Sequence, residues 1–246
     1  MVDPSRLLYN LYKVLWASLD LIFPPECVGC GEPGSQWCKK CQASVVRLPP
    51  PICDRCGESQ NRPGLCRNCQ DNPSPPVIIR SWVFFEGSIR NAIHQLKYSR
   101  NLSLGLVLAD SLTVFLDELG WNFDLVIPVP LGVARLQERG YNQAALLALP
   151  IALKTSAAYT PRGLVKVRDT PTQVGLDRRQ RRENVKDAFV AEPAVVSNRR
   201  ALVVDDVATS NATLEACAEA LLAGGAEKVY CITVARAGLH SIGGIP

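Results

Sequence analysis

The stretch RALVVDDVATSNATLEA, residues 200–216, decides the fold of this 246-residue chain. An apolar, β-branched run ends in Asp205 and Asp206, and a turn of small and hydroxyl-bearing residues then leads into a helical pattern. A short apolar run followed by a helix is typical of a strand in a parallel sheet. Ligands of open parallel sheets bind beyond the carboxyl ends of the strands, so we expect the two carboxylates to lie at a binding site.

The turn after the two acids has the composition of an anion site. Thr209, Ser210 and Thr213 offer hydroxyl donors, and the backbone amides at a helix start favour a phosphate group. Carboxylates beside a phosphate site suit a phosphorylated ribose, because they accept hydrogen bonds from sugar hydroxyls or bind Mg²⁺. One alternative is that the acids only cap a helix. The other is an acidic pocket like that of a receiver domain, whose acids should instead follow the first strand.

Strands and helices alternate on both sides of this stretch. Strands are predicted at 123–130, 200–206 and 228–236, and helices at 88–98, 103–119, 141–154 and 212–223, the last ending at Gly224 and Gly225. This alternation predicts an α/β domain with an open parallel sheet flanked by helices, over residues 77–240. Residues 160–187 hold eight Lys or Arg against four Asp or Glu with little apolar periodicity, which predicts a basic loop.

Eight of the ten cysteines form four C-x-x-C pairs between residues 27 and 69. Each pair directs two thiolates at one ion, and two pairs complete a tetrahedral zinc site. The shortest connections give two structural four-cysteine sites, one of Cys27, Cys30, Cys38 and Cys41, the other of Cys53, Cys56, Cys66 and Cys69. Disulfides and redox pairs are the alternatives, and the fourfold repetition argues against both.

We therefore predict a double zinc ribbon over residues 24–72, bounded by the Pro-rich segment DNPSPP at 71–76. The ribbon binds nucleic acid, binds a protein partner or braces the sheet domain, and its balanced charges do not choose among the three. Cys217 and Cys231 fall in a predicted helix and a predicted strand, so we expect them to be plain buried thiols.

Residues 1–23 predict an amphipathic helix that ends before Pro24. We expect its apolar face to pack on the protein's own body, in preference to a membrane surface or a partner. That face carries Leu7, Leu8, Leu11, Leu15 and Leu19. Charged residues interrupt the stretch and no cleavage site follows, so we expect neither a signal peptide nor a transmembrane segment. With thiols kept for metal, the expected location is cytoplasmic. The formal net charge of +4 is too small to indicate a partner.

VVDDVATSNATL resembles the phosphoribosyl pyrophosphate (PRPP) motif of type I phosphoribosyltransferases. Residues 124–148, DLVIPVPLGVARLQERGYNQAALLA, and 168–189, RDTPTQVGLDRRQRRENVKDAF, are similar in order to the ComF family of competence proteins, as is the preceding zinc module. The resemblance runs from about residue 21 to about residue 236. It implies a phosphoribosyltransferase-like fold and a role in DNA uptake and natural transformation.

The resemblance also implies roles for individual residues. Asp205 and Asp206 would hold the ribose of PRPP with Mg²⁺ and, with Arg168 and Arg178, carry any catalysis. The PRPP turn would comprise Ala208, Thr209, Ser210, Asn211, Ala212 and Thr213. The pyrophosphate loop would comprise Pro130, Leu131, Arg135, Arg139, Gly140, Asn142 and Gln143. The matching positions of the basic loop are Arg168, Gln173, Arg178, Arg182 and Asn184.

Two further positions bear on the resemblance. Related turns usually have Gly where Asn211 lies. Asn is the next most tolerant residue of positive φ, so the turn either keeps its shape or narrows the phosphate site and weakens PRPP binding. Lys97 and Tyr98 resemble a Lys-Tyr pair of the family, although a lysine ending a surface helix is the commoner case.

Three functions follow from the sequence. The first is a DNA-uptake protein that binds PRPP or a related nucleotide-like ligand and handles single-stranded DNA, with proteins of the uptake machinery as partners. The second is an active phosphoribosyltransferase, in which an acceptor nitrogen attacks the ribose anomeric carbon and pyrophosphate leaves. The third is a zinc-braced scaffold without catalysis.

Overall fold

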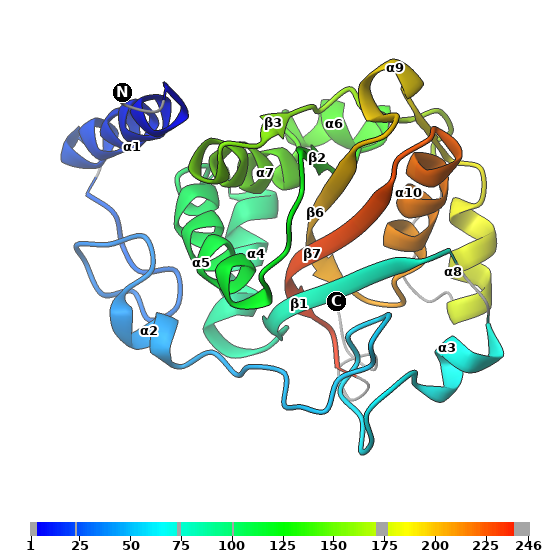
Figure 1. The fold of residues 1–246 in the computed structure, drawn as a ribbon. Helices are drawn as coiled ribbons and strands as arrows, with labels where there is room; N and C mark the ends of the chain where they lie inside the picture. The colour runs from blue at the N-terminus through cyan, green and yellow to red at the C-terminus, as the bar shows by residue number, and fades with distance from the viewer. Residues whose placement is uncertain (1–3, 23, 73–74, 100, 171–176, 239–246) are drawn as a thin grey trace.

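The computed structural model describes residues 4–22, 24–72, 75–99, 101–170 and 177–238. A five-stranded sheet runs in the order β1-β7-β6-β2-β3 (Figure 1). All its strand pairs are parallel, which confirms the predicted open parallel sheet. The strands are β1 (Val77–Phe84), β7 (Lys228–Arg236), β6 (Arg200–Ala208), β2 (Leu125–Pro128) and β3 (Ala158–Tyr159).

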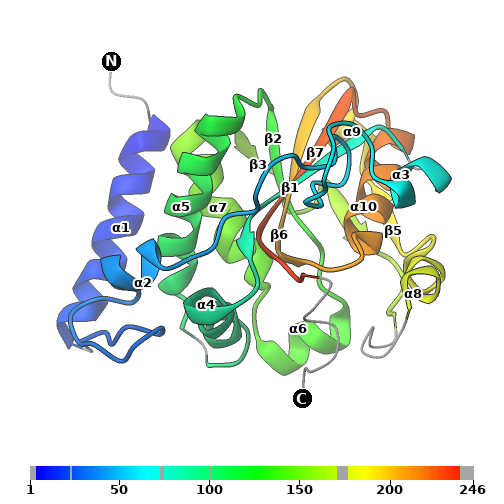
Figure 2. The same cartoon turned by 90° about the horizontal axis from the view of Figure 1, so that it is seen from below.

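Helices cover both faces of the sheet (Figures 1 and 2). On one face α4 (Gly87–Tyr98), α5 (Leu104–Leu119) and α7 (Gln143–Thr155) share a core with Leu202 and Val204 of β6. On the other face α10 (Ala212–Ala223) packs with Ala201 and Val203. Because side chains alternate along a strand, β6 supplies both cores. These four helices confirm the predicted ones to within two residues at each end.

The segment between β3 and β6 corrects the predicted basic loop. It contains β4 (Leu164–Lys166), α8 (Arg178–Val185), β5 (Phe189–Ala191) and the short α9 (Pro193–Val196). A capping box starts α8: the Gln180 amide donates to Asp177 Oδ1 at 2.8 Å, and Gln180 Oε1 accepts from the Asp177 amide at 2.9 Å. A polar helix with such a cap needs no apolar periodicity, which is why composition alone predicted a loop. Gln173 lies outside the described residues.

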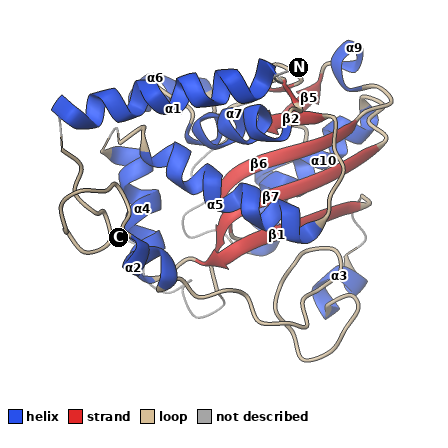
Figure 3. Ribbon diagram, turned by 60° about the vertical axis from the view of Figure 1, so that its left-hand side comes forward, coloured by secondary structure: helices blue, strands red, loops and turns tan. Residues whose placement is uncertain are grey.

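The cysteine-rich residues run along the β1 edge of the sheet (Figures 1 and 3). Two five-residue helices, α2 (Lys39–Ala43) and α3 (Arg67–Asp71), lie at opposite ends of that edge. The α2 end meets the sheet domain through Trp37, whose ring makes a T-shaped contact with Trp82 of β1 at 6.0 Å between centroids. At the α3 end the Ile79 amide donates to the Arg55 carbonyl at 2.7 Å. Each half of this edge module is therefore attached to β1 separately.

The N-terminal helix α1 (Pro4–Ile22) lies against the outside of α5 and α7 (Figure 2). Tyr9 donates to Asp110 of α5, and Lys154 of α7 pairs with the same carboxylate at 3.0 Å. The expectation that the leucine face packs on the body is wrong. Leu7, Leu8, Leu11 and Leu15 are 54–59% exposed. The opposite face packs instead, through the half-buried Tyr9, whose ring is apolar and whose hydroxyl reaches the half-buried Asp110. The side chain of Leu19 lies outside the described residues.

A short helix α6 (Val133–Arg139) follows β2 and ends at Gly140, whose φ is 82°. No helix within the described residues is long and apolar enough to cross a membrane.

Candidate phosphate site and metal centres

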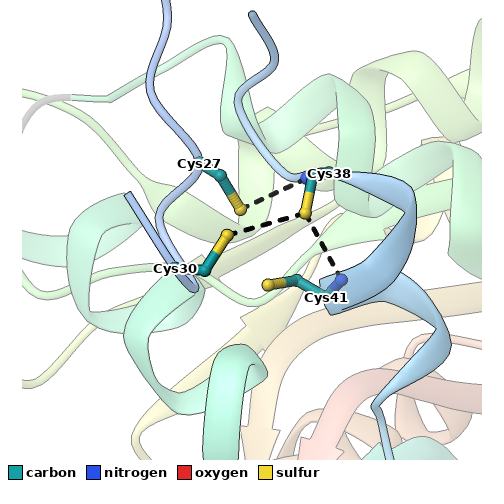
Figure 4. A group of neighbouring side chains, drawn as sticks. All are labelled: Cys27, Cys30, Cys38 and Cys41. Carbon is teal, nitrogen blue, oxygen red and sulfur yellow. Dashed lines mark hydrogen bonds between the residues drawn. The ribbon is translucent and has the colours of Figure 1, made fainter. Parts of the chain in front are cut away.

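The eight paired cysteines form two four-residue groups with the membership expected from the sequence. In each group the sulfur atoms lie within 4.8 Å of one another. Figure 4 shows Cys27, Cys30, Cys38 and Cys41 directed at a common point. The Cys30 and Cys38 Sγ atoms are 3.7 Å apart, and so are those of Cys56 and Cys66. Tetrahedral zinc with bonds of about 2.3 Å places its sulfur ligands about 3.8 Å apart, so both groups fit the metal.

Backbone amides support the thiolate form in both groups. The Cys38 amide points at Cys27 Sγ at 3.3 Å, and the Cys66 amide points at Cys53 Sγ at the same distance. Burial raises the pKa of the Cys27 thiol, but these amide hydrogen bonds outweigh it and lower the pKa to about 6. The same balance lowers the pKa of Cys53 to about 7. Each ribbon thus holds a ready thiolate ligand near neutral pH.

Asp206 is the centre of a buried polar cluster. Its side chain is 4% exposed, and its Oδ2 pairs with Lys97 Nζ at 2.5 Å. Gln143 donates to Oδ1 at 3.2 Å. Burial alone raises the pKa of Asp206, but the Lys97 charge and the hydrogen bonds of Lys97 and Gln143 lower it overall. The cluster therefore holds an ionised carboxylate that already has one cationic partner.

Asp205 lies on the other face of β6, because successive side chains of a strand point in opposite directions. The Asp206 amide donates to Asp205 Oδ1 at 2.9 Å. Burial and the neighbouring Asp206 charge raise the pKa of Asp205 well above its ordinary value. The strand continues past both acids to Ala208, two residues further than predicted. The carboxylates thus lie just before the strand end, and their pKa values are shifted in opposite directions.

The turn after β6 consists of Thr209, Ser210 and Asn211, and Ala212 begins α10. Asn211 is the N-cap and has φ 67° and ψ −3°, the left-handed conformation expected for its position. The Ala212 amide donates to Ser210 Oγ at 3.4 Å, and Thr213 lies in the first turn of the helix. The twelve-residue α10 directs its N-terminal amides at this turn, which is the arrangement that binds an anion.

Asn211 also contacts the second ribbon. Its Nδ2 donates to the Cys56 carbonyl at 3.5 Å, and Arg236 donates to the same carbonyl. Arg236 also donates to Asn211 Oδ1 at 3.2 Å. Arg236, at the end of β7, was not predicted as a site residue. The one feature of the sequence that could have indicated it is a charge at the end of the apolar run KVYCITVAR (228–236).

The predicted pyrophosphate loop divides into two parts. Arg139 donates to Gln143 Oε1 at 2.5 Å and lies 5.3 Å from the ring centroid of Tyr98, so it borders the Asp206 cluster. Asn142 caps α7 through the Ala144 amide at 3.0 Å and donates to the Val129 carbonyl at 2.9 Å. Arg135 is exposed on α6. Arg139, Asn142 and Gln143 thus reach or support the cluster, and Arg135 does not contact it.

Pro130 and Leu131 are half-buried where β2 leads into α6. A Cβ built on the next residue, Gly132, would lie 2.1 Å from Asp169 Oδ1. This loop therefore lies directly against the Asp169 side chain, in the segment that also carries Arg168.

Arg168 and Arg182 make contacts away from Asp205 and Asp206. Arg168 donates to the carbonyls of Asn184 and Lys186 at 3.2 and 2.5 Å. Arg182 Nε lies 3.3 Å from Glu215 Oε2, which ties α8 to the first turn of α10. The side chain of Arg178, at the start of α8, lies outside the described residues.

Lys97 is the main departure from sequence reasoning at the site. A lysine at a helix end is usually a surface charge, yet the Lys97 side chain is only 24% exposed and pairs with Asp206. The resemblance of Lys97 and Tyr98 to a family pair was the signal that could have identified it. His94, expected at the surface of the same helix, is exposed.

Comparisons with known proteins agree with this arrangement. Residues 18–70 match the model of the double zinc ribbon domain. DNA utilization protein YhgH of Salmonella typhi is 32% identical over 208 residues, which cover 80% of this chain and 91% of the relative. Competence protein F of Haemophilus influenzae is 31% identical over 211 residues, covering 81% and 90%.

Among solved structures, adenine phosphoribosyltransferase from Thermoanaerobacter pseudethanolicus has a TM-score of 0.35 and 17% identity, covering 56% of this chain and 83% of that chain. The two curated relatives, in contrast, align over about nine-tenths of their own length. The chain belongs to the ComF family of competence proteins, together with competence protein F and YhgH.

Proposed function

We propose that this protein binds PRPP, or a closely related phosphoribosyl ligand, with Mg²⁺ at the β6–α10 junction, and that it acts in DNA uptake by handling single-stranded DNA. The observation that carries the ligand proposal is the juxtaposition of Asp205 and Asp206 with the N-terminus of α10. Carboxylates accept hydrogen bonds from ribose hydroxyls, and the helix start binds the 5-phosphate. The DNA role rests on the relatives of this chain, which include a DNA utilization protein and a competence protein.

Asp205 and Asp206 would have different roles in binding the ligand. Lys97 already neutralises Asp206, which leaves that carboxylate for hydrogen bonding to a hydroxyl. Mg²⁺ bound near Asp205 would lower the raised pKa of this carboxyl, because a nearby cation favours the charged form. Arg139, at the edge of the cluster, offers a cation for pyrophosphate. When bound, Mg²⁺ would neutralise the charge of the pyrophosphate group.

Calorimetry with PRPP and Mg²⁺ tests the ligand. We expect Asp205→Asn to weaken binding at least tenfold, because the variant removes the charge while keeping the shape. Glu227→Gln, an exposed change at the opposite end of β7, is the matched control and should bind like the parent. No binding by the parent protein, or equal binding by Asp205→Asn, would contradict the ligand proposal. Release of pyrophosphate on adding bases or DNA would identify the phosphoribosyltransferase instead of a binding protein.

A mobility-shift assay across salt concentrations tests the DNA role. The helix α8 carries Arg178 and Arg179 at its start. If both contact phosphates, replacing them with Gln reduces the salt slope by about 1.4, since each single-strand phosphate contact contributes about 0.7. Arg90→Gln, an exposed arginine of α4, is the control. An unchanged slope would place the DNA surface elsewhere, and no shift with the parent protein would refute the DNA role.

A further inference from the structure

The second ribbon and the phosphate turn share one backbone carbonyl. The Cys56 carbonyl accepts hydrogen bonds from Asn211, the N-cap of α10, and from Arg236. Both donors are buried, at 7% and 4% exposure. Cys56 is itself one of the four cysteines of the second group. A ligand of the second metal is thus joined through its own backbone to the residue that shapes the turn.

We propose that zinc in the second four-cysteine group positions the phosphate turn, by holding the Cys56 carbonyl against Asn211 and Arg236. The inference rests on the proposed ligand site. It adds that ligand binding there depends on the zinc of the second group and not on that of the first. Asn211 and Arg236 act as positioning residues: they fix the backbone that faces the ligand.

The metal is what can hold this carbonyl in place. The buried cluster of the second ribbon consists of Cys53, Cys56 and Cys69, with Cys66 packed against them. Because the buried residues of this ribbon are the cysteines that bind the metal, the ribbon depends on the metal for its shape. The knuckle is also seated tightly on β1, since a Cβ at Gly57 would lie 2.4 Å from the Ile79 carbonyl oxygen. Zinc therefore fixes a rigid loop that reaches from the sheet edge to the turn.

The side chain of Asn211 is held at both ends. Its Nδ2 donates to the Cys56 carbonyl, and its Oδ1 accepts from Arg236. These contacts hold a non-glycine residue at φ 67°, a conformation that glycine adopts more readily. If the Cys56 carbonyl moves, the side chain loses one of its anchors, and the amides that follow lose their fixed direction.

The first group supplies a matched control because it sits elsewhere. Its Cys41 carbonyl accepts from Ser88 Oγ at 3.0 Å, at the start of α4. Cys27 and Cys41 belong to the main core together with Trp37. Losing the first zinc should loosen the α4 end of the edge module and leave the turn intact.

The test compares Cys66→Ser with Cys38→Ser. Both residues are half-buried and precede the short helix of their ribbon. Each variant should bind about one zinc fewer by metal analysis. We expect Cys66→Ser to weaken PRPP binding about tenfold, the change that corresponds to losing one hydrogen bond to a charged group. Cys38→Ser should stay within about twofold of the parent protein.

Amide hydrogen exchange across residues 208–216, measured without ligand, provides a second readout. Protection there should fall in Cys66→Ser and persist in Cys38→Ser. Asn211→Gly keeps the left-handed conformation but removes the side chain, so adding Cys66→Ser to it should cause little further loss of protection. That lack of additivity separates positioning through Asn211 from a general loss of stability.

The outcomes are distinct. Equal effects of Cys66→Ser and Cys38→Ser, or unchanged protection in Cys66→Ser, would overturn the inference. If the parent protein does not bind PRPP, the proposed ligand fails, while the exchange measurement still tests the link between the second zinc and the turn.

Discussion

At the scale of single residues, the pair of Lys97 and Asp206 explains why a charged lysine is half-buried at the end of α4. Removing one member of a fully buried pair costs about 3–5 kcal/mol, because the other charge is left without a partner. Lys97 is 24% exposed, so we expect Lys97→Met to lower the free energy of unfolding by about 2 kcal/mol. Denaturant unfolding measures this loss. The double variant Lys97→Met with Asp206→Asn should recover most of it, and failure to recover would mean that the lysine stem, not its charge, matters.

Whereas the Lys97–Asp206 pair stabilises the fold, we expect the Asp205 carboxylate to destabilise it at neutral pH. Burial and the Asp206 charge raise its pKa well above the ordinary value, so the folded protein holds this proton more tightly than the unfolded chain. Its stabilising contribution is full below the unfolded pKa of about 3.9 and is lost as the pH rises through the raised folded pKa.

Asp205→Asn cannot ionise, so the variant keeps the stability that the parent protein loses as the pH rises. Its melting temperature at pH 7 should be higher by about 2–4 °C for each kcal/mol gained in the free energy of unfolding. Melting curves from pH 4 to pH 8 should show the difference between the variant and the parent protein growing with pH. A difference independent of pH would contradict the raised pKa. Together with loss of ligand binding, a more stable Asp205→Asn would show that the carboxylate is kept at a cost in stability.

At the scale of elements, α8 is attached to the start of α10 through Arg182 and Glu215. The Glu215 side chain is 9% exposed, and its amide donates to the Asn211 carbonyl at 2.9 Å. Without Arg182, an unpaired carboxylate lies in the first turn of the helix, where it repels an incoming phosphate. We expect Arg182→Ala to weaken PRPP binding about fivefold, equivalent to about 1 kcal/mol.

Calorimetry on Arg182→Ala and on Arg182→Ala with Glu215→Gln checks the electrostatic explanation. The second change removes the repulsive charge, so it should restore affinity to near that of the parent protein. If the double variant binds as weakly as the single one, Arg182 acts on the ligand directly or through the position of α8.

At the scale of the whole molecule, local patterns predict the parts of the fold that local physics determines. The runs at 200–206 and 228–236 are apolar and β-branched, so their burial in a parallel sheet is visible in the sequence. The ribbons are equally visible, because cysteine spacing alone defines the ligands. The polar α8 was missed because its RRQRRENV sequence presents no apolar face and only the capping box marks its start.

The contacts that shape the candidate site lie beyond local patterns. Asn211 and Cys56 are separated by 155 residues in the chain, and Arg236 and Cys56 by 180. No periodicity relates residues at such distances, and the acid pair itself was found only because strand and helix are adjacent in sequence. The turn could therefore be predicted, whereas the carbonyl that supports it could not.

The strand order has a consequence for synthesis. Among the described strands β7 is made last and lies between β1 and β6, so β1 has no partner in the sheet until about 150 further residues have been translated. At about 5–20 residues per second, this wait lasts on the order of 10 s. Both ribbons are complete before β1 is made, so they can bind metal during translation, while β1 still lacks its partner strand β7. The chain order thus lets both four-cysteine groups form before the sheet is complete.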